Sequence, residues 1–178
     1  VMESFKVILD RVRTLSESTK DFRFVREDGE ALVFTPGQFF RFVFEDEQGS
    51  FERSYSLCNY APDVAESDLD LVISSVDGGR ASRLLFAAEA GLRSDVSGPF
   101  GRLVLPREMP RRLFLVATSV GIAPYMPMLA ELTKQLSLTG NGTLEIHMLY
   151  GVRDYNEFIY GADLCDYAAQ QPQFNLHL

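Results

Sequence analysis

The hydrophobic pattern of this chain changes once, at a short segment that begins and ends with proline (residues 106–110). Before this segment, apolar and polar residues alternate in short runs that end at turn pairs such as Asp28-Gly29 and Pro36-Gly37. After it, continuous apolar runs take turns with stretches in which apolar residues recur at helical spacing. This order predicts an all-β unit followed by an α/β unit, which we place at residues 1–108 and 111–178.

The first unit carries most of the strand signals. Aromatic and β-branched runs predict strands at 6–13, 21–25, 39–45, 51–57 and 69–75. A short helix is expected at 81–88, after Gly78-Gly79, and a last strand at 93–97. Several short strands in close succession indicate a barrel or a sandwich.

The second unit has the pattern of a parallel sheet. The apolar run at 112–117 is of the kind buried in such sheets, and it leads into a helix that begins near residue 125. Strands at 143–151 and 173–178 flank a second predicted helix at 158–170. This β-α-β-α-β alternation is half of a doubly wound sheet, which usually has about five or six strands, so we expect the sequence to be part of a longer chain.

Composition argues against several classes of protein. The two cysteines, Cys58 and Cys165, lie far apart in sequence, which fits reduced thiols in a cytoplasm and excludes an iron–sulfur cluster held by these residues alone. No apolar run approaches the roughly 20 residues of a membrane helix. We expect no metal site, and we expect His147 and His177 to be structural, because neither joins an acidic residue in a catalytic pattern.

Charge is unevenly distributed along the chain. A formal net charge of −8 and a pI of about 4.8 argue against a nucleic-acid partner. Residues 71–112 are locally basic and can attract a phosphate group or an acidic protein, although most of their arginines are expected to be ordinary surface residues. The arginines of this region are Arg80, Arg83, Arg93, Arg102, Arg107, Arg111 and Arg112.

The strand at 51–57 has polar residues that a barrel strand does not need. Arg53 and Tyr55 are two positions apart, so their side chains point to the same face, roughly 7 Å from each other. Ser56 follows at the end of the strand. A cation beside an aromatic ring suits an elongated ligand with a phosphate at one end and a flat ring at the other. The alternative is an ordinary strand with an arginine on its open face.

Three glycine turns are further candidates for binding. Gly79 and Ser82 lie between a strand and a helix, where free backbone N–H groups favour an anion; the alternative is a plain connection in which Ser82 caps the helix. The turn GPFG at 98–101 lets the backbone approach a neighbour closely. The buried strand at 113–117 turns through Gly121 into a helix, where parallel sheets bind a dinucleotide pyrophosphate.

These four features follow one another in the order found in the ferredoxin-NADP(H) reductase superfamily of flavoproteins, which the chain resembles over nearly its whole length. That family shows R-x-Y-S/T, then G-x-x-S, G-P-x-G and a G-G-T-G-I-A-P-type turn, and later a G-x-R-x-x-x-D/E-x-x-Y segment similar to residues 150–164. The matching residues of the first four motifs are Arg53, Tyr55, Ser56, Gly79, Ser82, Gly98, Pro99, Gly101, Gly121, Ile122, Ala123 and Pro124.

The resemblance implies a six-stranded antiparallel Greek-key barrel that binds FAD, followed by part of a doubly wound NAD(P)-binding domain. It implies that Arg53 pairs with the FAD pyrophosphate, and that Tyr55 and Ser56 are the catalytic positions, stacking on the isoalloxazine and bonding near flavin N5. The other implied cofactor-binding residues are Leu57, Cys58 and Asn59 beside the ring, Gly79, Arg80, Ala81 and Ser82 at the pyrophosphate, and Thr118, Ser119, Gly121 and Pro124 at the nicotinamide nucleotide.

The chain departs from the family pattern in its last glycine turn. Thr118 and Ser119 stand where the family has glycine, and Val120 stands where it has threonine. These side chains either crowd the pyrophosphate of NAD(P)H or, in the case of Ser119, donate a hydrogen bond to it.

The function implied by the resemblance is that of an FAD-dependent oxidoreductase, which moves hydride from NAD(P)H to flavin N5. The reduced flavin then passes electrons to a redox protein such as ferredoxin, flavodoxin or an oxygenase component. Three alternatives stay open: a free-flavin reductase, a non-catalytic flavin-binding module with a decayed nicotinamide site, and, for the first unit alone, an apolar-ligand barrel of the lipocalin kind.

Overall fold

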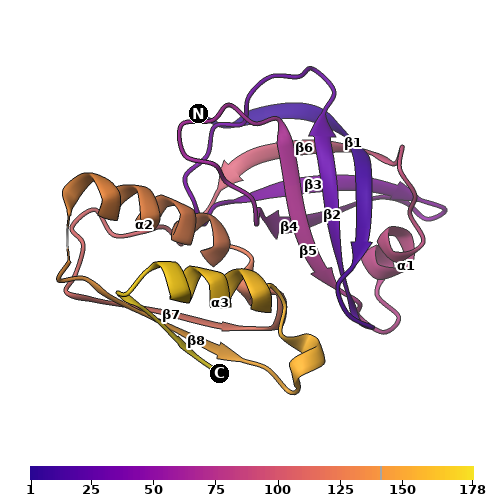
Figure 1. Ribbon diagram of the computed structural model, residues 1–178. Coiled ribbons are helices and arrows are strands. Elements are labelled where there is room, and N and C mark those ends of the chain that lie inside the picture. The colour runs from indigo at the N-terminus through magenta and orange to yellow at the C-terminus, as the bar shows by residue number, and fades with distance from the viewer. Residues whose placement is uncertain (141) are drawn as a thin grey trace.

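The period-two pattern of the first hundred residues produces one antiparallel sheet. The computed structural model describes residues 1–140 and 142–178 and contains the predicted strands and short helix in the predicted order (Figure 1). The elements of this unit are β1 (Glu3–Thr14), β2 (Thr19–Arg26), β3 (Phe39–Asp46), β4 (Gly49–Ser56), β5 (Asp68–Ser74), α1 (Arg80–Phe86) and β6 (Arg93–Phe100).

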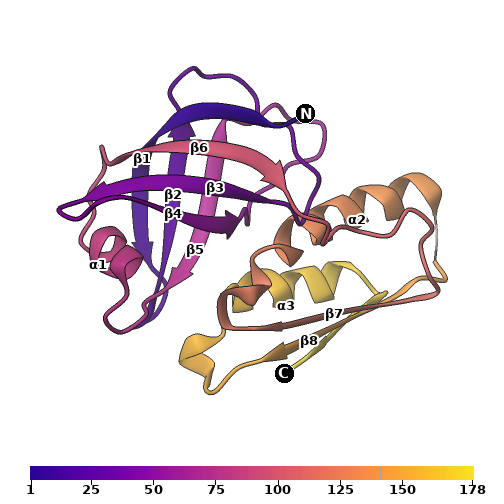
Figure 2. The ribbon, with the colours of Figure 1, turned by 180° about the vertical axis from the view of Figure 1, so that it is seen from behind.

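Strand order confirms the predicted six-stranded fold. The order is β4-β3-β6-β1-β2-β5, so β6 returns from the end of the unit to pair with both β1 and β3. The sheet curls into a half-barrel around a core of phenylalanines (Figures 1 and 2). The fully buried members of this core include Phe22, Phe24, Phe40, Phe42 and Phe44.

The two edge strands, β4 and β5, are joined by the residues that follow β4. The Cys58 N–H donates to the carbonyl of Asp70 at 2.9 Å. The side-chain amide of Asn59 donates to the carbonyl of Asp68 and accepts from the N–H of Asp70, each at 2.9 Å. These bonds draw the end of β4 toward β5 and leave the rest of β4 as an open edge.

The second unit is a parallel sheet with the order β7-β8-β9. Its helices α2 and α3 lie side by side over one face of the sheet (Figures 1 and 2). Leu115 and Ile146 are buried on that face, whereas Phe114 and Val116 are exposed on the other. The elements are β7 (Arg112–Thr118), η1 (Ser119–Ile122), α2 (Tyr125–Thr139), β8 (Glu145–Gly151), η2 (Tyr155–Glu157), α3 (Gly161–Gln170) and β9 (Phe174–His177).

Helix α2 is the longest of the described helices, with 15 residues. None of the helices in residues 1–140 and 142–178 combines the length and the hydropathy that a membrane crossing requires.

The two units touch along α2. Lys134 of α2 forms an ion pair with Asp63 at 2.7 Å. Gly37, just before β3, has a φ of +104°, and a Cβ added there would collide with the carbonyl oxygen of Leu103 and lie 2.5 Å from the methyl carbon of Met128. Glycine therefore meets two requirements at this position: a left-handed backbone and close packing against α2 and against the linker, which is the segment 101–111 between β6 and β7.

Replacing Gly37 with alanine is expected to lower the free energy of unfolding by about 2 kcal/mol or more, because backbone strain adds to the steric overlap. Gly49→Ala is the matched control, since Gly49 has a φ of +103° with no atom within 4 Å of an added Cβ. That variant should lose only the backbone strain, about 1 to 2 kcal/mol. Urea denaturation of both variants measures the difference, and equal losses would contradict tight packing at Gly37.

Candidate functional site

The open edge of β4 presents the first predicted site. Register places Arg53 opposite Phe42 and Tyr55 opposite Phe40, so both side chains lie on the face that carries the phenylalanine core. The half-buried ring of Tyr55 packs edge-to-face on Phe42, with ring centroids 5.8 Å apart. Burial raises the pKa of Tyr55 to about 12, against a smaller opposite effect of Arg53, so its hydroxyl stays neutral. Ser56, half-buried, ends the strand.

The glycine turn before α1 lies beside this edge. Gly79 is the N-cap of α1, and an added Cβ there would lie 2.9 Å from the carbonyl oxygen of Val76. The hydroxyl oxygen of Ser82 accepts from the N–H of Val76 at 2.8 Å. The alternative in which Ser82 is the N-cap of the helix is therefore wrong, because Gly79 holds that position. The hydroxyl of Ser82 instead bonds to Val76 and stabilises the turn that precedes the helix.

Arg80 brings a second guanidinium to β4. It donates two hydrogen bonds of 2.6 Å to the carboxylate of Asp46 and one of 2.9 Å to the carbonyl of Gly49. The bonds from Arg80 hold the pKa of Asp46 down to about 2. Arg80 lies 4.4 Å from the ring centroid of Phe51, and Arg53 lies 5.2 Å from the same ring. Two cations predicted to meet a pyrophosphate thus gather around one aromatic side chain.

The segment after β4 is partly buried and contacts the second unit. Leu57 is fully buried, and the thiol of Cys58 donates to the carbonyl of Asp70 at 3.2 Å. The Cys58 sulfur also lies 3.2 Å from the hydroxyl of Tyr160, which stands at a φ of +57° just before α3. Burial raises the pKa of Cys58 to about 12 and that of Tyr160 well above its usual value. Both groups are therefore neutral, and Cys58 has the character of a structural side chain.

The turn predicted at 98–101 is wrong for residues 98–100, which belong to β6, and the segment has a packing role in this structure. Gly98 lies against the core, since an added Cβ would be 2.6 Å from the ring of Phe40. The carbonyl of Gly101 accepts from the side chain of Gln38 at 3.3 Å. The close backbone approach expected here is made to the barrel itself.

The fourth predicted turn follows β7. Ser119 has a φ of +48°, a left-handed conformation that glycine adopts more easily, and its carbonyl accepts from the hydroxyl of Tyr150 at 2.7 Å. Its side-chain oxygen lies 3.4 Å from that of Ser74 in the barrel. Gly121 is exposed, with no atom within 4 Å of an added Cβ, and the buried Pro124 is the N-cap of α2.

Thr118 and Ser119 line a cavity of about 370 Å³ at the carboxyl ends of β7 and β8. Arg153 and Glu157 also line this cavity, and neither was among the predicted site residues. Their side chains form a bidentate ion pair with bonds of 3.1 and 2.8 Å. Their sequence signal is the position just after the second parallel strand, because ligands of parallel sheets collect at strand ends.

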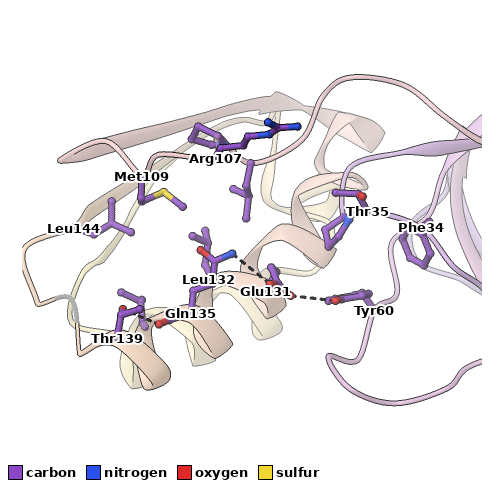
Figure 3. Close-up of a pocket in the computed structure, with 14 residues that line it drawn as sticks. Phe34, Thr35, Tyr60, Arg107, Met109, Glu131, Leu132, Gln135, Thr139 and Leu144 are labelled. Atoms are coloured by element: carbon purple, nitrogen blue, oxygen red, sulfur yellow. Dashed lines mark hydrogen bonds between the residues drawn. The ribbon is translucent and has the colours of Figure 1, made fainter.

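A larger cavity, of about 680 Å³, lies elsewhere, where the barrel, the linker and α2 meet (Figure 3). None of the predicted cofactor residues lines it. Among the described residues, no group of three or more histidine, cysteine, aspartate or glutamate side chains is arranged to hold a metal ion.

Comparison with known proteins identifies the family. Residues 6–105 match the family model described as the oxidoreductase FAD-binding domain, which covers more than half of the chain. The chain therefore belongs to this family of flavoproteins, as the resemblance to ferredoxin-NADP(H) reductases predicted.

Two curated relatives illustrate the range of the family. The chain is 32% identical over 162 residues to ferredoxin–NADP reductase B of Sorangium cellulosum (strain So ce56), with 91% of this chain and 64% of that protein covered. It is 28% identical over 172 residues to the toluate 1,2-dioxygenase electron transfer component of Pseudomonas putida, with 96% and 48% covered. The chain thus spans about half to two thirds of the length of these relatives.

Solved structures agree with the fold. The cytochrome P450 reductase GcoB of Amycolatopsis superposes with a TM-score of 0.81 at 23% identity, covering 98% of this chain and 51% of that one. This match supports the barrel-then-sheet architecture of the described residues.

The environments of the two cysteines predict different reactivities. In the folded protein, iodoacetamide at mildly alkaline pH should modify the exposed Cys165 and leave Cys58 unmodified, since the raised pKa of Cys58 keeps it as an unreactive thiol. Mass spectrometry should therefore find one adduct per native chain and two per denatured chain. Cys165→Ser should remove the native adduct; an adduct that persists on Cys58 would contradict the raised pKa of its thiol.

Proposed function

We propose that this chain binds FAD along β4 and forms the flavin-binding part, with the beginning of the nicotinamide-binding part, of an NAD(P)H-dependent oxidoreductase. The observation that carries the proposal is the arrangement of Arg53 and Arg80 around the ring of Phe51, on the same open strand edge as Tyr55. A pair of guanidiniums suits a pyrophosphate, because each can donate charge-assisted hydrogen bonds to phosphate oxygens. The half-buried Tyr55 offers a flat apolar face further along the same strand.

The residues present fit an elongated cofactor of this type. Arg53 is exposed, and its guanidinium donates only to the carbonyl of Glu52, at 2.7 Å, within the described residues. Gly79 fits the tight turn that leads into α1, because a Cβ there would lie 2.9 Å from the carbonyl oxygen of Val76, and the first N–H groups of α1 follow directly after it. When bound, the flavin supplies the hydride and electron chemistry, and the protein supplies orientation and charge. Ser56 would present its hydroxyl at the end of the strand, toward the ring edge.

The nicotinamide side of the proposal rests on the cavity beside Thr118 and Ser119. This cavity lies at the carboxyl ends of β7 and β8, where parallel sheets take up dinucleotides. Ser119 keeps a left-handed backbone although it is not glycine, so the turn has the conformation that a glycine at this position would favour. Arg153 lies at the rim, where its ion pair with Glu157 offers a guanidinium that a phosphate could compete for. These features favour retention of a nicotinamide site over its decay.

The acceptor class is an iron–sulfur or oxygenase protein. Relatives of this chain include a ferredoxin–NADP reductase and an electron transfer component of a dioxygenase. Arg102, Arg107 and Arg111 of the linker have no carboxylate partner among the described residues, so this region can favour the approach of an acidic protein.

The experiment that tests the proposal has two stages. The chain is first titrated with FAD and with riboflavin, which lacks both the pyrophosphate and the adenosine; tight binding of FAD alone, lost in Arg53→Ala, supports the arginine pair as a phosphate site. The complete protein is then mixed anaerobically with NADH or NADPH in a stopped-flow instrument, and loss of flavin absorbance is followed. If the protein binds FAD but neither nucleotide reduces the flavin, the nicotinamide part of the proposal is wrong and the protein is a flavin-binding module.

Removing either key side chain of β4 is expected to weaken flavin retention. Arg53→Ala should lower FAD affinity about tenfold or more, because charge-assisted bonds to phosphate are worth about 1.5 to 3 kcal/mol. Tyr55→Ala should lower it through the lost stacking surface. Arg41→Ala is the matched control, since Arg41 pairs in register with Ser54 and lies on the opposite face of the sheet. If Arg53→Ala and Tyr55→Ala bind FAD as tightly as Arg41→Ala does, β4 is not the FAD site.

A further inference from the structure

The 680 Å³ cavity between the two units has the size and place of a small-molecule site (Figure 3). Sites for organic ligands are commonly about 300 to 1,000 Å³ and often lie between domains. The walls come from three segments: residues 34–36 with Tyr60 from the barrel, residues 105–109 from the linker, and α2 with Leu144 from the second unit. Neither unit alone forms the cavity.

The lining is mostly apolar, with an aromatic wall on the barrel side. The rings of Phe34 and Tyr60 meet edge-to-face with centroids 5.8 Å apart, and Phe34 also packs on Phe40 of the core at 6.0 Å. This wall is held in place by the core and suits a flat apolar body. The apolar lining residues are Phe34, Pro36, Leu105, Pro106, Met109, Leu132, Leu136 and Leu144.

The acidic group of the cavity is already satisfied. The hydroxyl of Tyr60 donates to one carboxylate oxygen of Glu131 at 3.1 Å, and the side chain of Gln135 donates to the other at 3.3 Å. Burial, followed by the contact with Glu131, raises the pKa of Tyr60 to about 12, so its hydroxyl remains a donor. Both carboxylate oxygens of Glu131 therefore already accept a hydrogen bond, so this group does not require a cationic ligand.

Arg107 is in the opposite situation. It lies on the linker wall of the cavity, exposed, and its side chain makes no hydrogen bond or ion pair within the described residues (Figure 3). A planar guanidinium with no partner is suited to bind a carboxylate through two parallel bonds. Elsewhere in the chain, arginines that pair closely with carboxylates include Arg13, Arg23, Arg26, Arg80, Arg93, Arg112 and Arg153.

We propose that this cavity binds a small aromatic carboxylate. Its ring system lies between the aromatic wall and the leucines of α2, and its carboxylate pairs with Arg107. The inference goes beyond the proposed flavin function, since none of these residues belongs to the flavin or nicotinamide site. Because both units and the linker contribute walls, the occupant stabilises the arrangement of the two units by mass action.

The test uses isothermal titration calorimetry of the FAD-saturated chain with 2-naphthoate, and with the uncharged 2-naphthamide as its matched probe. We expect 2-naphthoate to bind one site per chain with a dissociation constant on the order of 0.1 mM. It should bind about fivefold or more tightly than 2-naphthamide, through the charge-assisted pair with Arg107. Arg107→Gln should abolish this preference for the anion. Arg102→Gln, which removes another unpartnered linker arginine that does not line the cavity, should keep it.

Three results would overturn the proposal. The first is equal binding of the two probes by the wild-type chain, or no binding of either at millimolar concentration. The second is an equal loss of preference in both arginine variants, which would indicate a diffuse basic surface. The third is competition of 2-naphthoate with FAD, which would place the probe in the flavin site.

Both arginines are exposed, so circular dichroism should find both variants folded. If the chain does not bind FAD, the same titration is made with the FAD-free chain. A preference for 2-naphthoate that depends on Arg107 would then still support the cavity as a carboxylate site, although the proposed flavin function had failed.

Discussion

The bonds between the end of β4 and β5 are the constraint on which the candidate site depends. Asn59 uses its whole side-chain amide to hold the backbone of β5, and the N–H of Cys58 adds a third bond. The half-barrel is thereby drawn together at one end only, while the edge at Arg53 and Tyr55 keeps its backbone unpaired on one side within the described residues. An edge strand is normally a liability for aggregation. Here its side chains face the direction in which an extended cofactor can lie.

The same segment also sets the position of the second unit. Cys58 meets Tyr160 from the loop before α3, and Ser74 at the end of β5 meets Ser119 from the turn after β7. Both contacts join the barrel to the loops that border the cavity beside Thr118 and Ser119. Gly37 and Met128 add close packing on the linker side. In the proposed function, hydride transfer requires two rings to be held at a fixed separation, and these contacts would help to fix that separation.

Much of this fold could be predicted from sequence, because strand and helix patterns are local. The strand predicted at 69–75 lies at Asp68–Ser74, and the helix predicted at 81–88 lies at Arg80–Phe86. The helix predicted from 158 begins only at Gly161, because Tyr160 takes a left-handed conformation that interrupts it. The period of two also predicted correctly that Arg53 and Tyr55 share one face of β4. The partners of Arg80 and Tyr160 could not be found this way, since Asp46 and Cys58 lie 34 and 102 residues away in sequence and no periodicity relates them.

The pairing of Arg80 with Asp46 has a consequence for ligand selection. With its carboxyl pKa near 2, Asp46 carries a full negative charge at any physiological pH and occupies the guanidinium fork of Arg80. An anion that binds Arg80 must therefore displace this carboxylate or use the guanidinium N–H groups that Asp46 leaves free. In the proposed FAD complex, the doubly charged pyrophosphate would compete with Asp46 for Arg80 more strongly than a monoanion would, so this ion pair would favour ligands of higher negative charge.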